Sequence, residues 1–180
     1  MQTKYDVFLG LGSNILPEKN LPFALQELSS LFGTLTLSNT YESAAVGFDG
    51  PNFWNLVVQT ETAMDLESLR LTLRDIEYKL GRDLKAEKYS NRTVDIDILL
   101  YGNITGIIGN LVLPREEITY NAFVLRPLSE LYPEGVHAGS QLSYRTLWQN
   151  FEGDRELKLV KNGNDILNVD SNTENFGLIA

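Results

Sequence analysis

The sequence contains no cysteine and only one histidine, His137, among its 180 residues. Without cysteine, the chain forms no disulfide, no thiol nucleophile and no cysteine-based zinc site. A Ser-His-Asp triad would have to use His137, but this residue lies in the polar, glycine-flanked stretch 134–139, and no G-x-S-x-G motif occurs. We therefore expect His137 to be an exposed loop residue. Any catalysis has to rest on carboxylates, arginines, hydroxyls, backbone amides or a bound metal.

Long apolar runs are also missing. No segment approaches the roughly 20 consecutive apolar residues that cross a bilayer, and the first residues lack the apolar stretch of a signal peptide. We expect a cytoplasmic protein that does not enter membranes. The length fits one domain, and 43% apolar residues supply its core. We assign this domain to residues 1–153. Apart from a short strand at 157–160, we expect 154–180 to be a loosely held tail, because it is rich in asparagine and lacks periodicity.

Positive charge is scarce, since 15 lysines and arginines face 24 acidic residues and the net charge is −9. A field of this sign repels nucleic acid and anionic membranes, so we expect neither as a partner. Segment 82–92 is the exception, with four basic and two acidic residues. Such a basic island suits a compact anion such as a polyphosphate, although a solvated charged loop would have the same composition.

Hydrophobic periodicity predicts six regular elements in the order β-α-β-β-α-β. The strands are expected at 5–11, 35–41, 55–61 and 94–101, and the helices at 20–32 and 66–80. This order is that of a ferredoxin-like α+β fold, whose antiparallel sheet carries both helices on one face. Short strands near 104–113 and helices near 123–131 and 144–151 would cover the other face and give three layers, α/β/α.

Two aspartates interrupt the apolar strand at 94–101. Because Asp95 and Asp97 are two residues apart, both carboxylates point to one side of the sheet, while Val94, Ile96 and Ile98 point to the other. Two like charges at a partly buried site call for a cation, and hard oxygen ligands favour Mg²⁺ or Mn²⁺. The pattern predicts a metal site, the alternative being an edge strand with a wet polar face.

Arginines accompany this pair of carboxylates. Arg92 lies three residues before Asp95, and Arg82 begins the polar loop 82–91 that leads to it. A carboxylate-bound metal beside arginines is typical of phosphoryl transfer, because the transition state spreads negative charge over the phosphoryl oxygens. We expect the loop to close over a substrate and bring its arginines with it.

Two further motifs lie on predicted strands. The segment GLGSN at 10–14 lacks the lysine and spacing of a P-loop, so its glycines are expected to permit close backbone approach. In Phe53-Trp54-Asn55, Phe53 and Asn55 share one strand face. With Phe123, this aromatic and amide pair could stack on a flat heterocycle and read its polar edge, whereas core packing is the alternative for each phenylalanine.

Together the motifs follow the order and spacing of one family. They are LGLGSN at 9–14, FWN at 53–55, EYKLGR at 77–82, NRTVDIDILLYG at 91–102 and FVLRPL at 123–128. From about Tyr5 to Pro133 the chain resembles the 6-hydroxymethyl-7,8-dihydropterin pyrophosphokinases. The resemblance implies a ferredoxin-like fold and transfer of pyrophosphate from ATP to a pterin alcohol in folate biosynthesis. It also implies two Mg²⁺ ions, ATP as co-substrate and, we expect, a monomer.

The resemblance assigns roles to residues of this chain. Asp95 and Asp97 would bind the two Mg²⁺ ions, and Arg82 and Arg92 would be the catalytic arginines. The residues that would bind the pterin are Ser43, Ala45, Val46, Phe53, Asn55 and Phe123, with the two phenylalanines on either side of the ring. Those that would bind ATP are Arg74, Glu77, Lys85, Tyr89, Ile98 and Arg115.

Three positions depart from the family pattern. Arg115 stands where histidine is usual and Asn121 where arginine is usual, and both usual residues serve the ATP phosphates. Losing one charged phosphate contact would cost about 1.5 to 3 kcal/mol, although Arg115 can supply a replacement charge. Asn91 replaces a usual proline, which should loosen the loop. We expect an active but weaker or specialised enzyme.

Two alternatives to this enzyme stay open. One is a pterin-binding protein that no longer transfers, which the changes at Arg115 and Asn121 would permit. The other is a ferredoxin-like interaction domain without a small ligand, which would have no aromatic slot between Phe53 and Phe123.

Overall fold

The computed structural model describes residues 3–82 and 90–168. Its first elements are β1 (Tyr5–Ser13), α1 (Pro17–Phe32), β2 (Thr36–Leu37), β3 (Thr40–Ser43), β4 (Phe53–Thr62), α2 (Leu66–Lys79) and β5 (Asp95–Tyr101). This is the predicted order, except that the second strand is divided. The break occurs at Ser38, whose side-chain Oγ accepts the Val57 N–H at 2.8 Å in place of a backbone carbonyl.

The strands form an antiparallel sheet in the order β5-β1-β4-β3-β8, where β8 is Lys158–Lys161, with β2 also paired to β4. Strand β1 lies between β4 and β5. Gly10 and Gly12 of β1 are opposite Asp97 and Asp95 of β5, and Gly12 is opposite Asn55 of β4. Three motifs that are far apart in the sequence thus become neighbours on the adjacent strands β5, β1 and β4.

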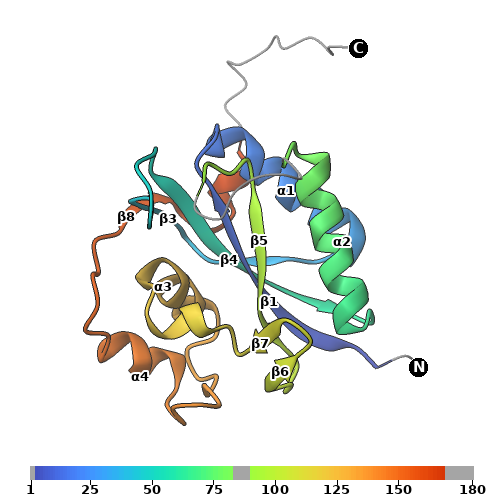
Figure 1. Ribbon diagram of the computed structural model, residues 1–180, viewed down its shortest axis with the longest axis vertical. Coiled ribbons are helices and arrows are strands. Elements are labelled where there is room, and N and C mark those ends of the chain that lie inside the picture. Colours follow the sequence, from blue (N-terminus) through green and yellow to red (C-terminus); the bar gives the residue numbers. More distant parts are fainter. Residues whose placement is uncertain (1–2, 83–89, 169–180) are drawn as a thin grey trace.

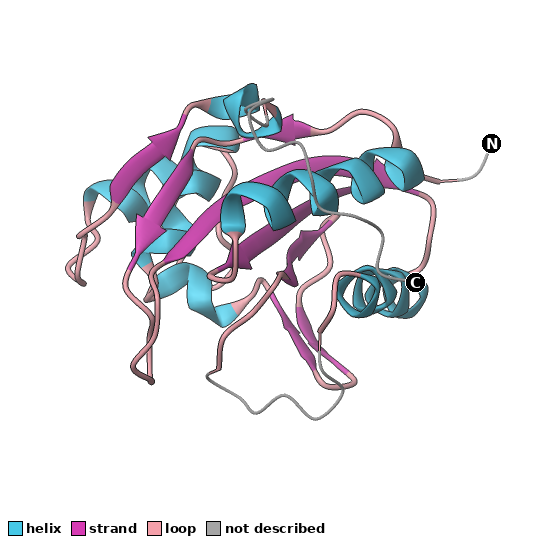
Figure 2. Ribbon diagram, turned by 90° about the horizontal axis from the view of Figure 1, so that it is seen from above, coloured by secondary structure: helices cyan, strands magenta, loops and turns pink. Residues whose placement is uncertain are grey.

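Helices cover both faces of this sheet, as the three-layer prediction requires (Figures 1 and 2). On one face α1 and α2 enclose a core that includes Leu9, Leu25 and Ile96. On the other face α3 (Ala122–Leu131) and α4 (Tyr144–Gln149) enclose a second core that includes Phe8, Val57 and Leu125. The expected ferredoxin-like α+β arrangement is confirmed.

The ends of α2 fix where the chain enters the polar segment after it. Asp65 caps the helix, since its Oδ1 accepts the Ser68 N–H at 2.8 Å. Just past the helix, Gly81 has a φ of 92°, a conformation that favours glycine. The Arg82 N–H then bonds to the Glu77 carbonyl at 3.0 Å. This turn brings Arg82 back toward the sheet.

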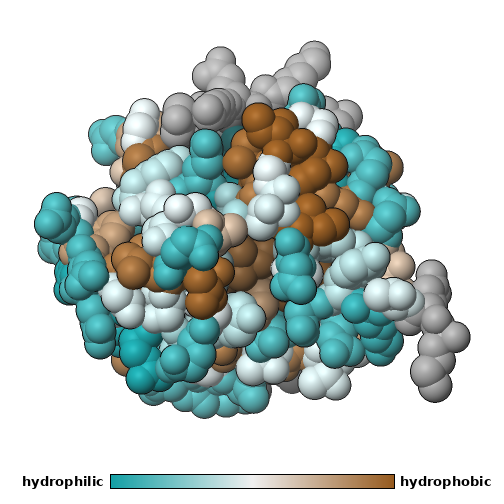
Figure 3. Space-filling view, turned by 90° about the horizontal axis from the view of Figure 1, so that it is seen from below, coloured by the Kyte–Doolittle hydropathy of each residue, from teal (hydrophilic) through white to brown (hydrophobic). Residues whose placement is uncertain are grey.

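A small hairpin follows β5. It consists of β6 (Gly106–Ile108) and β7 (Leu111–Leu113), and the 3-10 helix η1 (Glu116–Thr119) connects it to α3. The hairpin exposes Ile107 and Ile108. Figure 3, which views the molecule from below, shows hydrophobic residues gathered on this face, and Figure 1 labels the hairpin at the same lower edge of the molecule.

Within the segment 154–180, which we expected to be a loosely held tail, residues 158–167 pack against the rest of the domain. Strand β8 (Lys158–Lys161) is close to the strand expected at 157–160, and it pairs with the edge strand β3. In η2 (Gly163–Leu167) Ile166 is 2% exposed and belongs to the α1–α2 core. The composition gave no sign of this packing because one side chain and a set of backbone hydrogen bonds provide it.

His137 is buried, and the expectation of an exposed loop residue is wrong. The ring packs edge-on against Tyr144, with ring centroids 6.2 Å apart, and Nδ1 accepts the Ser140 N–H at 3.1 Å. Burial lowers the pKa of His137. Its role is therefore structural, within the α3–α4 layer.

Within residues 3–82 and 90–168, none of the helices combines the length and the apolar character that crossing a membrane requires.

Candidate active site

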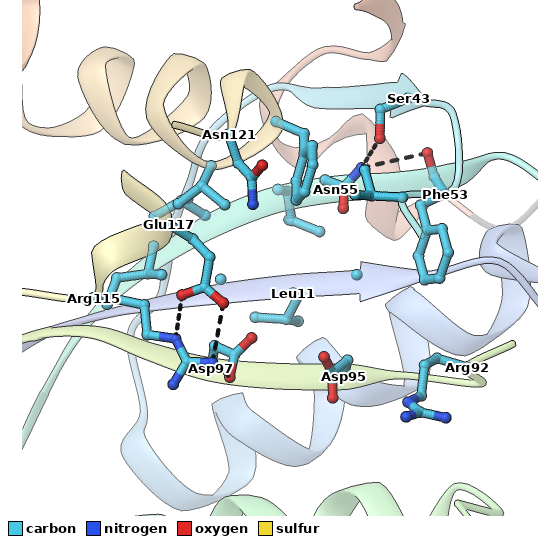
Figure 4. A pocket seen from close by; sticks show the side chains of 18 of the residues that line it. Leu11, Ser43, Phe53, Asn55, Arg92, Asp95, Asp97, Arg115, Glu117 and Asn121 are labelled. Carbon is cyan, nitrogen blue, oxygen red and sulfur yellow. Dashed lines mark hydrogen bonds and ion pairs between the residues drawn. The ribbon is translucent and has the colours of Figure 1, made fainter. Parts of the chain in front are cut away.

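A cleft of about 540 Å³ opens on the α3 face of the sheet (Figure 4). Its floor is formed by β1, β4 and β5, and its walls by η1, the start of α3 and the segment after β3. Among its lining residues are ten that the sequence predicts for the site. These are Ser43, Val46, Phe53, Asn55, Arg82, Arg92, Asp95, Asp97, Arg115 and Phe123.

Glycines of β1 keep the floor of the cleft low. A Cβ atom on Gly12 would lie 3.2 Å from Oδ1 of Asn55 and 3.7 Å from Cδ1 of Phe53. A Cβ on Gly10 would lie 3.3 Å from Cδ2 of Leu99. The expected close approach is confirmed, because a Cβ atom at either position would crowd a side chain of a neighbouring strand.

The two aspartates of β5 project into the cleft, with side chains 39% and 42% exposed, while Ile96 and Ile98 are buried in the opposite core. The predicted alternation is thereby confirmed. Partial loss of hydration inside the cleft and the nearby charge of Asp95 raise the pKa of Asp97 to about 6, against the opposing effect of Arg115. The pair is thus a site of unfavourable negative charge that attracts cations.

Arg82 lies between two carboxylates. Its Nη1 is 2.5 Å from Oε2 of Glu77 and 2.9 Å from Oδ1 of Asp95. Glu77 does not line the cleft, because its Oε1 accepts the backbone N–H of Ile96 at 2.7 Å from within the core. Burial raises the pKa of Glu77 to about 7, while the Ile96 hydrogen bond and Arg82 oppose this shift. Glu77 therefore joins α2 to β5 and orients Arg82.

Arg115 enters the cleft from the opposite wall. Its backbone N–H bonds to the Leu99 carbonyl at 3.0 Å, which ties the residue to β5. Its Nη2 is 3.3 Å from Oδ1 of Asp97, and its Nε is 2.5 Å from Oε2 of Glu117. Glu117 is a cleft residue that the sequence reasoning missed. The available signal was its spacing, since an acid two residues after Arg115 can reach back to that guanidinium.

The far end of the cleft combines aromatic rings with a fixed amide. Nδ2 of Asn55 donates to Oγ of Ser43 at 3.0 Å and to the Phe53 carbonyl at 3.4 Å. These bonds orient the amide and leave its Oδ1 beside Gly12. Phe53 projects into the cleft from β4, and the edge-on ring of Phe48 supports it at a centroid distance of 6.2 Å. Phe123 lines the same cleft from α3.

Some predicted residues lie elsewhere. Arg74 is on the exposed face of α2, and Ala45 is next to the lining residues Ala44 and Val46 without lining the cleft itself. The Ile98 side chain lies in the core on the opposite face, because it alternates with Asp97 along β5. Lys85 and Tyr89 are outside the described residues. Asn121, just before α3, lines the cleft. So do three residues that the sequence did not single out, Phe48, Ser90 and Tyr120.

Fold and cleft together define a ferredoxin-like α+β protein whose site has one charged end and one aromatic end. The family model described as 7,8-dihydro-6-hydroxymethylpterin-pyrophosphokinase (HPPK) matches residues 8–133. The chain belongs to this family.

Named relatives agree with this membership. The 2-amino-4-hydroxy-6-hydroxymethyldihydropteridine pyrophosphokinase of Haemophilus influenzae is 35% identical over 158 residues, which are 84% of this chain and 96% of that protein. The protein of the same name from Synechocystis is 35% identical over 138 residues, which are 75% of this chain and 70% of that protein.

A solved structure shares the fold. The crystal structure of Plasmodium falciparum HPPK-DHPS with pteroate matches with a TM-score of 0.70 at 15% identity. The match covers 84% of this chain but only 43% of that longer chain. Identity this low is evidence for the fold alone.

Proposed function

We propose that the protein transfers pyrophosphate from ATP to 6-hydroxymethyl-7,8-dihydropterin, which yields AMP and the pterin diphosphate in folate biosynthesis. Family membership and the named relatives support this activity. The observation that carries it is that one cleft holds the carboxylates of Asp95 and Asp97 together with the rings of Phe53 and Phe123. An interaction domain without a small ligand would not need such a cleft.

The aromatic end suits the pterin. A flat ring between Phe53 and Phe123 would bury its faces against apolar carbon, and its polar edge would meet the amide of Asn55. Ser43 holds that amide in one orientation, so the edge of the ring would meet a fixed donor and acceptor pattern.

The charged end suits the triphosphate. We assign Arg82 and Arg92 as the catalytic arginines, because both line the cleft beside Asp95 and can neutralise charge on the phosphoryl oxygens. Arg115 would add a further charge for the phosphates from the opposite wall, at the position where the family usually has histidine.

The donor set also fits magnesium. Among the described residues no group of three or more His, Cys, Asp or Glu side chains could hold a metal ion. Two carboxylates are nevertheless enough for Mg²⁺ in sites where water and substrate phosphates complete the shell. We propose that Asp95 and Asp97 hold two Mg²⁺ ions, which would neutralise phosphate charge when bound.

The reaction proposed is an in-line displacement. The pterin hydroxymethyl oxygen bonds to the β-phosphorus, the bond from that phosphorus to the oxygen bridging it to the α-phosphorus breaks, and AMP leaves with the oxygen. The hydroxyl proton is released to solvent. The chain's part is to align the two substrates and to hold fixed charges around the phosphates. We further propose that the protein acts as a monomer in the cytoplasm, as the resemblance and the lack of long apolar runs in the sequence led us to expect.

The direct test is product formation. Protein mixed with ATP, Mg²⁺ and 6-hydroxymethyl-7,8-dihydropterin should release AMP and pterin diphosphate in equal amounts. Omitting the pterin or adding EDTA should abolish AMP release. A folded protein that binds the pterin but forms no AMP with Mg²⁺ present would contradict the proposal.

A further inference from the structure

Asn14, the last residue of the GLGSN motif, is buried with 5% of its surface exposed, and both ends of its side-chain amide are hydrogen-bonded. Its Oδ1 accepts the backbone N–H of Arg92 at 2.7 Å, and its own backbone N–H donates to the Arg92 carbonyl at 3.1 Å. Asn14 thus hydrogen-bonds both the backbone N–H and the backbone carbonyl of Arg92, which lies 78 positions away in the sequence.

The other half of the Asn14 amide reaches two further segments. Its Nδ2 donates to Oδ1 of Asn91 at 2.9 Å and to the carbonyl of Pro51 at 3.2 Å. Pro51 precedes Phe53, which begins β4 at the aromatic end of the cleft, and Arg92 lines its charged end. Asn14 therefore connects the end of β1 to the supports of both ends of the cleft.

These contacts change the meaning of Asn91. The sequence suggests that asparagine in place of the family's proline loosens this segment. In the structure, the Asn91 side chain accepts a hydrogen bond from Asn14, which a proline could not do. Asn91 thus adds a side-chain anchor at the point where backbone stiffness is lost.

We propose that Asn14 is a positioning residue for Arg92, and that Asn91 is its partner in this role. This inference rests on the proposed function, since it assigns a task to the anchor of a catalytic arginine. Asparagine suits the position because one planar amide supplies an acceptor for the Arg92 N–H and two donors for Asn91 and Pro51. Aspartate has the acceptor without the donors, and alanine has neither.

The test compares Asn14→Ala, Asn14→Asp and Asn91→Ala with the control Asn20→Ala. Asn20 donates a hydrogen bond to the Ile15 carbonyl in the same turn, and within residues 3–82 and 90–168 its side chain forms no hydrogen bond to Pro51, Asn91 or Arg92. We expect kcat to fall roughly ten- to hundredfold in Asn14→Ala, because a misplaced catalytic group loses alignment. In Asn91→Ala, kcat should fall several-fold. The pterin Kd measured without ATP should change less than about threefold, because Phe53 and Asn55 are held by β4.

Exchange of the Arg92 backbone amide with deuterium gives a second readout. Asn14→Ala should speed this exchange about tenfold or more, whereas Asn14→Asp, Asn91→Ala and Asn20→Ala should retain most of the protection. If Asn14→Ala does not fold, Asn14→Asp and Asn91→Ala carry the kinetic test. Each removes the hydrogen bond that Asn14 Nδ2 donates to Asn91, and each keeps an oxygen on residue 14 that can accept the Arg92 N–H.

The outcomes separate the two proposals. If the wild-type protein makes no AMP, the proposed function fails, and exchange at Arg92 still decides whether Asn14 anchors it. The anchor is overturned if the Asn14 variants match Asn20→Ala in both kcat and exchange. It is also overturned if they lose pterin binding in proportion to kcat, since that would place the effect of Asn14 at the aromatic end.

Discussion

Arg115 bridges Asp97 and Glu117, with Nη2 3.3 Å from Oδ1 of Asp97 and Nε 2.5 Å from Oε2 of Glu117. The guanidinium is therefore held at the carboxylate proposed to bind magnesium, and a second acid keeps it there. A fixed positive charge at this place can contact phosphate oxygens with little loss of side-chain entropy.

The first prediction concerns Arg115 itself. Arg115→Ala should raise the KM for ATP roughly ten- to hundredfold, because one charged hydrogen bond to phosphate is worth about 1.5 to 3 kcal/mol. The KM for the pterin should stay within about twofold. Arg145→Ala is the control, since Arg145 forms an exposed ion pair with Glu134 at 2.6 Å. Equal ATP kinetics in the two variants would exclude Arg115 from the nucleotide site.

Removing one carboxylate tests the metal assignment. Asp97→Asn keeps the shape of the side chain but removes a charged ligand, so AMP formation should fall by more than about a hundredfold. The Mg²⁺ concentration for half-maximal binding of a non-hydrolysable ATP analogue, followed by calorimetry, should rise. Glu61→Gln changes an exposed carboxylate on β4 and should alter neither quantity. Unchanged magnesium dependence in Asp97→Asn would remove this residue from the metal site.

The aromatic slot predicts a loss of pterin binding. Phe53→Ala and Phe123→Ala should each weaken the pterin Kd by roughly ten- to hundredfold, because each removes one stacking surface. Phe23→Ala, which alters an exposed ring on α1, should leave the Kd within about twofold. Fluorescence titration with the pterin in the absence of ATP measures all three. Pterin binding that survives both cleft substitutions would place the ring elsewhere.

Two adjacent residues test the packing of the C-terminal segment. Ile166 is 2% exposed and Leu167 is 48% exposed. Ile166→Ala should therefore lower the free energy of unfolding by roughly 2 to 5 kcal/mol, and Leu167→Ala by less than about 0.5 kcal/mol. Urea denaturation of the full chain gives both values. Similar small losses in the two variants would mean that η2 contributes little to the core.

Glu77 predicts a dependence of stability on pH. Burial raises its pKa from 4.5 to about 7, so between these values the folded state binds more protons than the unfolded state. The contribution of Glu77 to the free energy of unfolding should become less favourable as pH rises through that range, on the order of 1 to 3 kcal/mol. Urea denaturation across this range should show that the free energy of unfolding of Glu77→Gln increases relative to that of the wild type as pH rises.

The control for this titration is Glu67→Gln on the same helix. The Arg70 hydrogen bond lowers the pKa of the exposed Glu67 carboxylate, so its contribution cannot weaken as pH rises through that range. A difference between wild type and Glu77→Gln that stays constant from about pH 4.5 to about pH 7 would contradict the predicted titration of Glu77.

The sequence predicted the site unevenly. Asp95, Asp97, Phe53 and Asn55 were placed on the correct strand faces, because alternation along a strand is a local property. The partners of these residues were harder to foresee. Arg115 meets Asp97 across two separate elements, and Glu77 acts from within the core through Ile96. Contacts of this kind depend on how separate elements pack.

The sequence by itself determined the order of strands and helices, the face on which the carboxylates lie and the family, since backbone sterics and hydrophobic periodicity act between near neighbours along the chain. Only the tertiary structure decided that Asn14 grips Arg92, that Asn91 is an anchor, and that Ile166 completes the core. Each of these depends on segments that are distant in sequence meeting in space. The hydrogen bonds of Asn14 and Asn91 use backbone groups and short amides, and the packing of Ile166 uses a single apolar side chain, so no pattern in the sequence marks these contacts in advance.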